Sequence, residues 1–208
     1  MKEIFSLKKL YKDRKKEILS RVRNFEEINI KDEKKVFTEM CFCLLTPQSK
    51  AKKCWDAITT LKKKELLFNG TADEIQKCLT GVRFHKNKSF YIINAKKSFP
   101  GIMKLLNDSN DPVLSREELV RNVKGLGYKE ASHFLRNVGL GKTLAILDRH
   151  ILKNLLKYKV IPHIPTTLTK KIYLDIEKKM LAFSKEIKIP IEHLDLLFWS
   201  IQTGEVFK

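Results

Sequence analysis

Apolar residues recur at intervals of three and four along most of the chain, the spacing of one face of an α-helix. Ile151, Leu152, Leu155 and Leu156, for example, would share a single helical face. No stretch alternates apolar and polar residues between turn signals, so a β-sheet is not expected. The pattern predicts an all-α fold with helices at about 2–28, 33–46, 50–62, 72–79, 86–98, 116–123, 128–138, 149–158, 168–184 and 191–202.

Capping and helix-breaking residues mark the expected ends of these helices. Thr71 with Glu74, and Ser115 with Glu118, have the spacing of a capping box, in which each side chain binds the other residue's backbone N–H. Glycines and prolines between the helical patterns are expected to interrupt them. These breakers are Pro47, Gly70, Gly101, Pro112, Gly139, Pro162, Pro165 and Pro190. The sequence shows neither a repeat nor a low-complexity linker.

The charge balance narrows the class of partner. The chain has 208 residues, enough for one large or two small domains, and its 42 Lys and Arg against 24 Asp and Glu give a net charge of +18. Such a charge either favours a polyanion such as nucleic acid or forms a solvated lysine-rich surface. No apolar run is long enough to span a membrane. Residues 1–19 contain charges throughout and no apolar signal-peptide core, so a cytoplasmic protein is expected.

The four cysteines do not have the spacing of a metal site. They stand at positions 41, 43, 54 and 78, without a Cys-x-x-Cys pair or a histidine pattern, so no bound metal is expected. Cys41 and Cys43 lie in the apolar stretch MCFCLL. We therefore expect both side chains in the core.

Residues 122–150 carry the strongest chemical signal. The glycine pair in Gly125-Leu126-Gly127 precedes a helical pattern that begins with Lys129 in its first turn. Glycines let backbone N–H groups approach a phosphate closely, and the helix behind them points its positive dipole end at the same anion. Taken singly, most such glycine pairs are ordinary turns and most such lysines are solvated. Together they indicate a phosphate-binding hairpin beside a reactive amine.

Asp148 stands nineteen positions after Lys129 and follows an apolar run at 144–147. Because a helical pattern begins just after it, Asp148 is expected to cap the N-terminus of that helix. A capping aspartate at such a position can also face a reacting centre. The order of hairpin, lysine and aspartate favours a functional site, which none of these residues indicates alone.

The segment resembles the helix-hairpin-helix-GPD superfamily of DNA base-excision glycosylases at the hairpin glycines, Lys129 and Asp148. The strings KGLGYKEASHFLRNVG, LDRHIL and FWSIQTGEVFK are similar to the second, mainly archaeal family of 8-oxoguanine DNA glycosylase/AP lyases. The resemblance implies excision of 8-oxoguanine from double-stranded DNA, with Lys129 as the Schiff-base nucleophile and Asp148 assisting it. No cofactor is implied, because the iron–sulfur cluster of the endonuclease III branch needs cysteines after Cys78.

The same resemblance implies two helical domains with the active site in the cleft between them. A helical barrel over residues 33–149 would end in the helix-hairpin-helix motif. Residues 1–32 and 150–208 would form the second domain. The protein is expected to be a monomer.

Further roles follow from the resemblance. Phe84, in VRFHKNKSFYI, and Trp199 would stack on the extruded base, although both also suit a helical core. Lys208 would use its terminal carboxylate to accept hydrogen bonds from the oxidised purine. A frayed tail is the ordinary fate of a terminus, and the apolar Val206 and Phe207 favour docking instead.

The DNA backbone would be held by Gly125, Gly127, Lys50 and Arg149. One loop departs from the family pattern, because Thr46-Pro47-Gln48-Ser49-Lys50 replaces an alanine-asparagine pair that many members have. Gln48 resembles the glutamine with which endonuclease III relatives fill the gap left by the flipped base. The opposite-base preference therefore stays open.

Two alternatives to 8-oxoguanine excision remain at the level of sequence. The substrate could be an oxidised pyrimidine or a mismatched thymine. The chain could also be a non-catalytic helix-hairpin-helix module that only holds DNA. Lys129 together with Asp148 disfavours the module, because phosphate binding requires neither residue.

Overall fold

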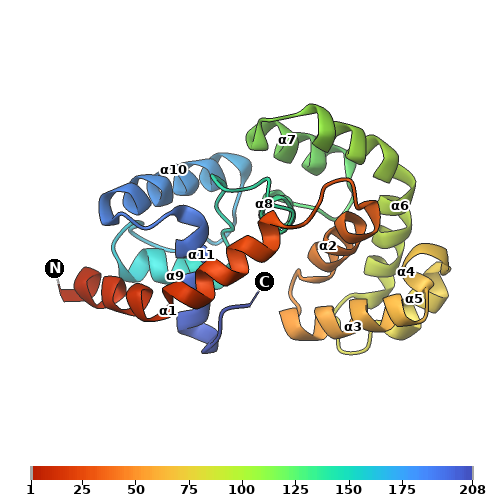
Figure 1. Cartoon of the computed structure of the whole chain (residues 1–208), viewed down its shortest axis with the longest axis horizontal. Helices are drawn as coiled ribbons and strands as arrows, with labels where there is room; N and C mark the ends of the chain where they lie inside the picture. Colours follow the sequence, from red (N-terminus) through yellow and green to blue (C-terminus); the bar gives the residue numbers. More distant parts are fainter. Residues whose placement is uncertain (1, 208) are drawn as a thin grey trace. The chain divides into compact units, whose positions relative to one another are not determined.

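The computed structural model describes residues 2–207, except for the side chain of Lys2, and these residues form eleven α-helices and no β-strand. The helices are α1 (Lys2–Glu26), α2 (Glu33–Leu45), α3 (Ala51–Lys63), α4 (Leu66–Asn69), α5 (Ala72–Cys78), α6 (His85–Asp108), α7 (Pro112–Asn122), α8 (Tyr128–Asn137), α9 (Arg149–Lys157), α10 (Lys170–Ile187) and α11 (Ile191–Thr203) (Figure 1). The all-α fold class is confirmed.

Backbone contacts divide the described chain into two compact units. The central unit comprises residues 28–138, and the terminal unit comprises the described residues up to 27 and from 139 onward. The sequence placed these boundaries after residues 32 and 149 instead. Residues 139–149, including Asp148, therefore belong to the same unit as α1, α9, α10 and α11.

The core of the central unit forms around α2. Every residue of this helix from Val36 to Leu45 is buried, because α3, α6 and α8 pack against it (Figure 1). Cys41 and Cys43 are fully buried, as expected for core residues. Burial raises the pKa of the Cys41 thiol well above its usual value.

The core of the terminal unit forms around α11. Most residues from Ile191 to Phe198 are buried, with α1, α9 and α10 packed against the helix (Figure 1). α1 contributes an apolar stripe that includes Leu7, Ile18 and Val22. The hydroxyl of Tyr11 lies 2.8 Å from Nδ1 of His193, and this part-buried contact joins α1 to α11.

One expected capping box is present and the other is not. Thr71 and Glu74 exchange both hydrogen bonds at the start of α5, which confirms the first. The Ser115–Glu118 box is wrong, because α7 begins at Pro112, four residues before the expected start at residue 116. The carboxylate of Asp111 accepts the N–H groups of Val113 and Leu114 there. Proline suits this position because the first helical N–H groups have no partner inside the helix.

Gly101 was expected to break a helix and does not, whereas Pro112 does mark a boundary, the start of α7. α6 continues through Pro100 and Gly101 to Asp108, well beyond the expected end at residue 98. The continuation buries a further apolar face formed by Ile102, Met103 and Leu106. The energy of that burial outweighs the local helix-breaking tendency of proline and glycine. The short α4 was not foreseen.

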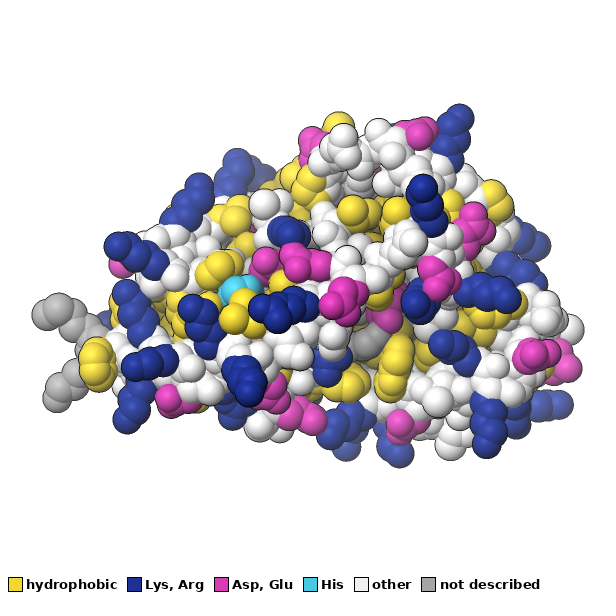
Figure 2. Space-filling model, in the orientation of Figure 1, with side chains coloured by type: hydrophobic (Ala, Val, Ile, Leu, Met, Phe, Trp, Pro, Cys, Tyr) yellow, Lys and Arg dark blue, Asp and Glu magenta, His cyan; other side chains and the backbone are white. Residues whose placement is uncertain are grey.

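Basic side chains cover much of the visible surface. Figure 2 shows Lys and Arg side chains over both units, with acidic side chains between them. None of the helices formed by residues 2–207 combines the length and apolarity that a bilayer crossing requires.

Candidate active site

The expected glycine hairpin connects α7 to α8 in the central unit. Gly125 has a φ of 100°, in the left-handed region, and the N–H of Leu126 closes a turn onto the carbonyl of Val123. A Cβ on Gly125 would lie 2.5 Å from Cδ2 of Tyr91 in α6. Gly125 is therefore required both by its backbone conformation and by the ring packed against it.

A second set of contacts fixes the start of α8, whose N-cap is Gly127. The hydroxyl of Tyr128 donates to the carboxylate of Glu117, with oxygen–oxygen distances of 2.6 and 2.7 Å. The guanidinium of the fully buried Arg116 lies 5.3 Å from the centre of the Tyr128 ring. These contacts join α7 to the first turn of α8 and hold the hairpin from both sides.

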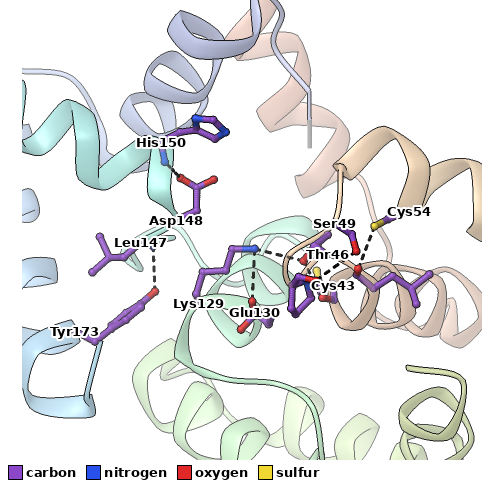
Figure 3. Close-up of polar contacts among 12 residues, drawn as sticks. Cys43, Thr46, Ser49, Cys54, Lys129, Glu130, Leu147, Asp148, His150 and Tyr173 are labelled. Atoms are coloured by element: carbon purple, nitrogen blue, oxygen red, sulfur yellow. Dashed lines mark hydrogen bonds and ion pairs between the residues drawn. The ribbon is translucent and has the colours of Figure 1, made fainter. Parts of the chain in front are cut away.

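Lys129 projects from this first turn. Its Nζ lies 3.4 Å from Oγ1 of Thr46 and 3.7 Å from Oε1 of Glu130 (Figure 3). The side chain is 21% exposed, so the amine is accessible but held by neighbours. A primary amine in this setting can act as a nucleophile toward a carbon electrophile.

Thr46 belongs to a tight turn that follows α2. The N–H of Ser49 donates to the carbonyl of Thr46 at 3.0 Å, and Gln48 between them has a φ of 54°. This is the turn position at which glycine or asparagine is ordinarily preferred. Gln48 and Lys50 are both exposed, as a role toward DNA requires.

A pocket of about 240 Å³ opens beside the hairpin. Its lining joins the hairpin to the turn after α2 and to the first turns of α6. The lining residues are Leu44, Pro47, Phe84, Asn87, Lys88, Tyr91 and Gly125. Phe84 is 52% exposed and has the guanidinium of Arg83 5.5 Å from its ring centre. An exposed aromatic face at a pocket suits stacking on a planar ligand.

Asp148 lies in the terminal unit and caps α9, as the sequence predicted. Its Oδ1 accepts the N–H of His150 at 2.7 Å (Figure 3) and that of Ile151 at 2.8 Å. Both bonds use the same oxygen, so the second carboxylate oxygen is not needed for capping. The residue is partly exposed, so its charge can serve a neighbouring group as well as the helix.

The backbone just before Asp148 is held by α10. The hydroxyl of Tyr173 donates to the carbonyl of Ala145 at 2.7 Å and accepts from the N–H of Leu147 (Figure 3 shows the second bond). The carboxylate of Glu177 accepts the N–H of Ala145 at 2.8 Å. This extended segment has no helical bonds of its own, so these side chains satisfy its buried polar groups.

The other expected site residues of the terminal unit are Arg149 and Trp199. Arg149 is exposed at the first position of α9. Trp199 is partly exposed near the end of α11, and its ring centre lies 5.9 Å from that of Phe207. Val206 is buried, and whether the C-terminus docks as expected stays a prediction. Lys208 lies outside the described residues.

Sequence reasoning missed several residues that support the site. Thr46 was noted only as part of a loop, and Lys88, Tyr91, Tyr173 and Glu177 were not noted at all. One signal was available for Lys88, because it occupies a position on the apolar face of its helix, four residues before a buried isoleucine. Within residues 2–207, no three His, Cys, Asp or Glu side chains lie close enough to hold a metal ion together.

Comparison with known proteins gives consistent matches. A family model described as 8-oxoguanine DNA glycosylase matches residues 18–189. A protein of Fusobacterium nucleatum named 8-oxoguanine DNA glycosylase/AP lyase is 44% identical over 208 residues, covering 97% of this chain and 96% of the relative.

Solved structures agree with the sequence matches. The Methanocaldococcus jannaschii 8-oxoguanine glycosylase/lyase, in complex with a 15mer DNA containing 8-oxoguanine, matches with a TM-score of 0.92 and 34% identity, covering 100% of both chains. The 8-oxoguanine DNA glycosylase of Thermotoga maritima matches with a TM-score of 0.90 and 30% identity, covering 100% of this chain and 99% of that one. The hairpin, the lysine behind it and the capping aspartate thus occur in a chain that belongs to the 8-oxoguanine DNA glycosylase family.

Proposed function

We propose that this chain is a bifunctional DNA glycosylase/AP lyase that excises 8-oxoguanine from double-stranded DNA. Its family and its relatives at 34–44% identity support the reaction class. The observation that carries the proposal is the place of Lys129, whose amine lies in the first turn behind the hairpin, 3.4 Å from the Thr46 hydroxyl.

The proposed chemistry begins with the amine of Lys129. Its nitrogen attacks C1′ of the extruded nucleotide while the bond from C1′ to the base breaks, and the base leaves with the bonding electrons and gains a proton. Loss of the nitrogen's proton and opening of the sugar ring give a Schiff base. The imine acidifies C2′–H, and removal of that proton expels the 3′ phosphate group. The strand is thereby cut by β-elimination.

Asp148 is proposed to stabilise positive charge on the sugar as the base departs and to help deprotonate Lys129. Its capping geometry supports this role, because both N–H groups bind Oδ1 and leave the other oxygen available. Tyr173 and Glu177 support it indirectly by fixing the backbone that leads to the residue.

The proposed grip on DNA uses backbone N–H groups and exposed cations. Gly125 and Gly127 would bring N–H groups to a phosphate, with Lys50 and Arg149 adding charge. Gln48, exposed on its strained turn, is proposed to fill the gap left by the extruded nucleotide.

The proposed base contacts are aromatic. Phe84 presents an exposed ring at the pocket beside the hairpin, and a stacked base is worth roughly 1–3 kcal/mol. Trp199 is proposed as a second stacking surface, because its ring is partly exposed at the end of α11.

Borohydride trapping on a panel of duplexes tests the function. Borohydride reduces the imine and links protein to DNA permanently. The panel contains 8-oxoguanine, an oxidised pyrimidine, a thymine–guanine mismatch, an abasic site and undamaged DNA, with each lesion placed opposite each of the four bases.

We expect trapped complexes with the 8-oxoguanine and abasic duplexes. Trapping with the pyrimidine or mismatch duplex instead of 8-oxoguanine would reassign the substrate. DNA binding without trapping, even on the abasic duplex, would reduce the chain to a non-catalytic binding module.

A further inference from the structure

Lys88 is a buried lysine with an unusual set of partners. Its side chain lies on the inner face of α6, and the residue is only 2% exposed. Nζ donates to the carbonyls of Leu45 and Pro47, at 2.7 Å each, and to Oγ of Ser49 at 3.0 Å. An ammonium group has three N–H donors, and each of them has a protein acceptor here.

The three acceptors surround Thr46. Leu45 and Pro47 are its immediate neighbours, and Ser49 closes the turn through its N–H bond to the Thr46 carbonyl. The Thr46 hydroxyl donates to the carbonyl of Cys43 at 2.9 Å, so its oxygen lone pairs face the amine of Lys129 at 3.4 Å. Lys88 thus holds the backbone on both sides of the residue that contacts the proposed nucleophile.

The turn that Lys88 holds is strained. Gln48 has a left-handed backbone, with a φ of 54°, which costs a non-glycine residue free energy and persists only where surrounding contacts impose it. Its two neighbours, Pro47 and Ser49, are both bonded to Lys88. The Ser49 hydroxyl oxygen also accepts the N–H of Arg83, which joins the turn to the start of α6.

We infer that Lys88 is a positioning residue, which fixes the turn at residues 46–49 so that Thr46 holds the amine of Lys129 in place for attack. Lys88 does not touch the substrate in this role. Its contribution is to remove freedom from the turn, so that the nucleophile is oriented before the substrate arrives. Pre-orientation of this kind lowers the barrier of the chemical step more than it changes affinity.

The electrostatic setting of Lys88 agrees with the inference. Burial lowers the pKa of its ammonium to about 8, and the charges of Lys129 and Arg83 lower it as well, while Cys54 and Glu130 act in the opposite direction. Burial of an ammonium group costs free energy, because the charge loses its contact with water. At Lys88 the three hydrogen bonds to protein acceptors offset this cost.

The inference rests on the proposed function and is tested by the rate of borohydride trapping on an abasic-site duplex. Enzyme is in excess over a low, fixed concentration of duplex, so that each rate is that of a single turnover, and the enzyme concentration is varied. Lys88→Met removes the donors but keeps much of the apolar stem. We expect the maximal trapping rate to fall roughly ten-fold or more, while the half-saturating concentration changes little.

A matched control separates position from charge. Lys86→Met removes the same charge two residues earlier in α6, where the side chain is exposed. We expect its maximal trapping rate to match wild type. Equal maximal rates for Lys88→Met and wild type, or equal losses in the two lysine variants, would overturn the inference.

A double-mutant cycle tests whether Lys88 acts through Thr46. Thr46→Val removes the hydroxyl beside Lys129, and adding Lys88→Met to it should slow trapping little further. Two losses that multiply would contradict the inference. Should Lys88→Met fail to fold, Ser49→Ala decides the question, because it removes one acceptor. It should slow trapping roughly two- to ten-fold, and an unchanged rate would overturn the inference.

Failure of the proposed function would give a different result. The wild-type protein would then form no trapped complex, and both proposals would be overturned. Failure of the inference alone would leave wild-type trapping intact and unaffected by Lys88→Met.

Discussion

The ring of Tyr91 fills the space that a side chain on Gly125 would need, 2.5 Å from the position of an added Cβ. We therefore expect Gly125→Ala to displace the hairpin. The left-handed backbone alone costs an alanine about 1–3 kcal/mol, and the clash adds to this. The variant should unfold at lower urea concentration and bind undamaged duplex more weakly.

Two variants serve as controls for Gly125→Ala. Gly127 has extended backbone, and a Cβ there would meet only the end of the Glu130 side chain, at 3.2 Å from its carboxylate, so Gly127→Ala should keep nearly full stability. Tyr91→Ala combined with Gly125→Ala should lose less stability than the two single losses added together. Equal effects of alanine at both glycines would show that the ring is not the constraint.

Lys129→Gln should retain DNA binding and lose both borohydride trapping and strand cleavage. The amine is the proposed nucleophile, and glutamine cannot form an imine. Trapping gels and a binding titration on the same abasic duplex measure the two properties. Lys64→Gln, which removes the same charge from an exposed lysine at the end of α3, should trap normally. Undiminished trapping by Lys129→Gln would exclude this lysine.

Asp148→Asn separates the charge of this residue from its capping role. Asparagine also caps helices well, so stability should change by less than about 0.5 kcal/mol. Release of 8-oxoguanine should fall by roughly a hundred-fold or more, because the negative charge is lost at the transition state. Asp148→Ala should lose the same activity and also about 1 kcal/mol of stability.

Asp111 provides the matched control, because it caps α7 with the same geometry, accepting two N–H groups through Oδ1. Asp111→Ala should lose about 1 kcal/mol of stability while base release by the folded protein stays at the wild-type rate. Normal base release by Asp148→Asn would leave Asp148 with capping as its only role.

Binding to undamaged duplex should weaken steeply as salt rises, because cations of the protein displace counterions from phosphates. A chain with a net charge of +18 has many such cations. If Lys50 and Arg149 each contact a phosphate, replacing either with Gln should reduce the slope of log affinity against log salt by about one.

Lys64→Gln is again the control for the salt series, because Lys64 lies at the opposite end of α3 from Lys50, about 20 Å away by helical rise. Its slope should equal that of wild type. If the slope of log affinity against log salt is near zero for the wild-type protein, electrostatic binding to the phosphates is excluded.

Lys88 should make stability depend on alkaline pH. Its pKa is lowered from 10.5 to about 8 in the folded protein, chiefly by burial. Between these values the unfolded chain holds this proton more firmly than the folded chain does. The contribution of Lys88 to stability therefore rises from pH 8 to pH 10.5 and is lost again as the pH falls.

Urea unfolding of wild type and Lys88→Met at pH 7 and pH 10 measures this dependence. The difference in unfolding free energy should shift in favour of wild type at the higher pH. If the difference in unfolding free energy between wild type and Lys88→Met is the same at both pH values, folding does not change the pKa of Lys88.

Local rules determined most of what the sequence revealed. The hairpin follows from Gly125 and Gly127, and the start of α9 from Asp148, because each depends on atoms within about four residues along the chain. The nucleophile could be proposed for the same reason, since Lys129 stands directly behind the hairpin. The resemblance to a glycosylase family then supplied the reaction.

The tertiary structure decided the features that depend on distant partners. Gly101 has local signals of a break, yet α6 continues because burial of the following apolar residues is worth more than the local preference. The Ser115–Glu118 spacing suggested a cap, but Asp111 and Pro112 start the helix first.

The residues that hold the site in place could not be predicted from the sequence either. Lys88 is separated by about forty residues from the turn that it holds, and Tyr91 by thirty-four from Gly125. No local pattern records such pairs, because their energies arise only when packing brings buried donors, acceptors and rings together. The sequence alone was enough to propose which residues carry the chemistry, and the packing determined what holds them in place.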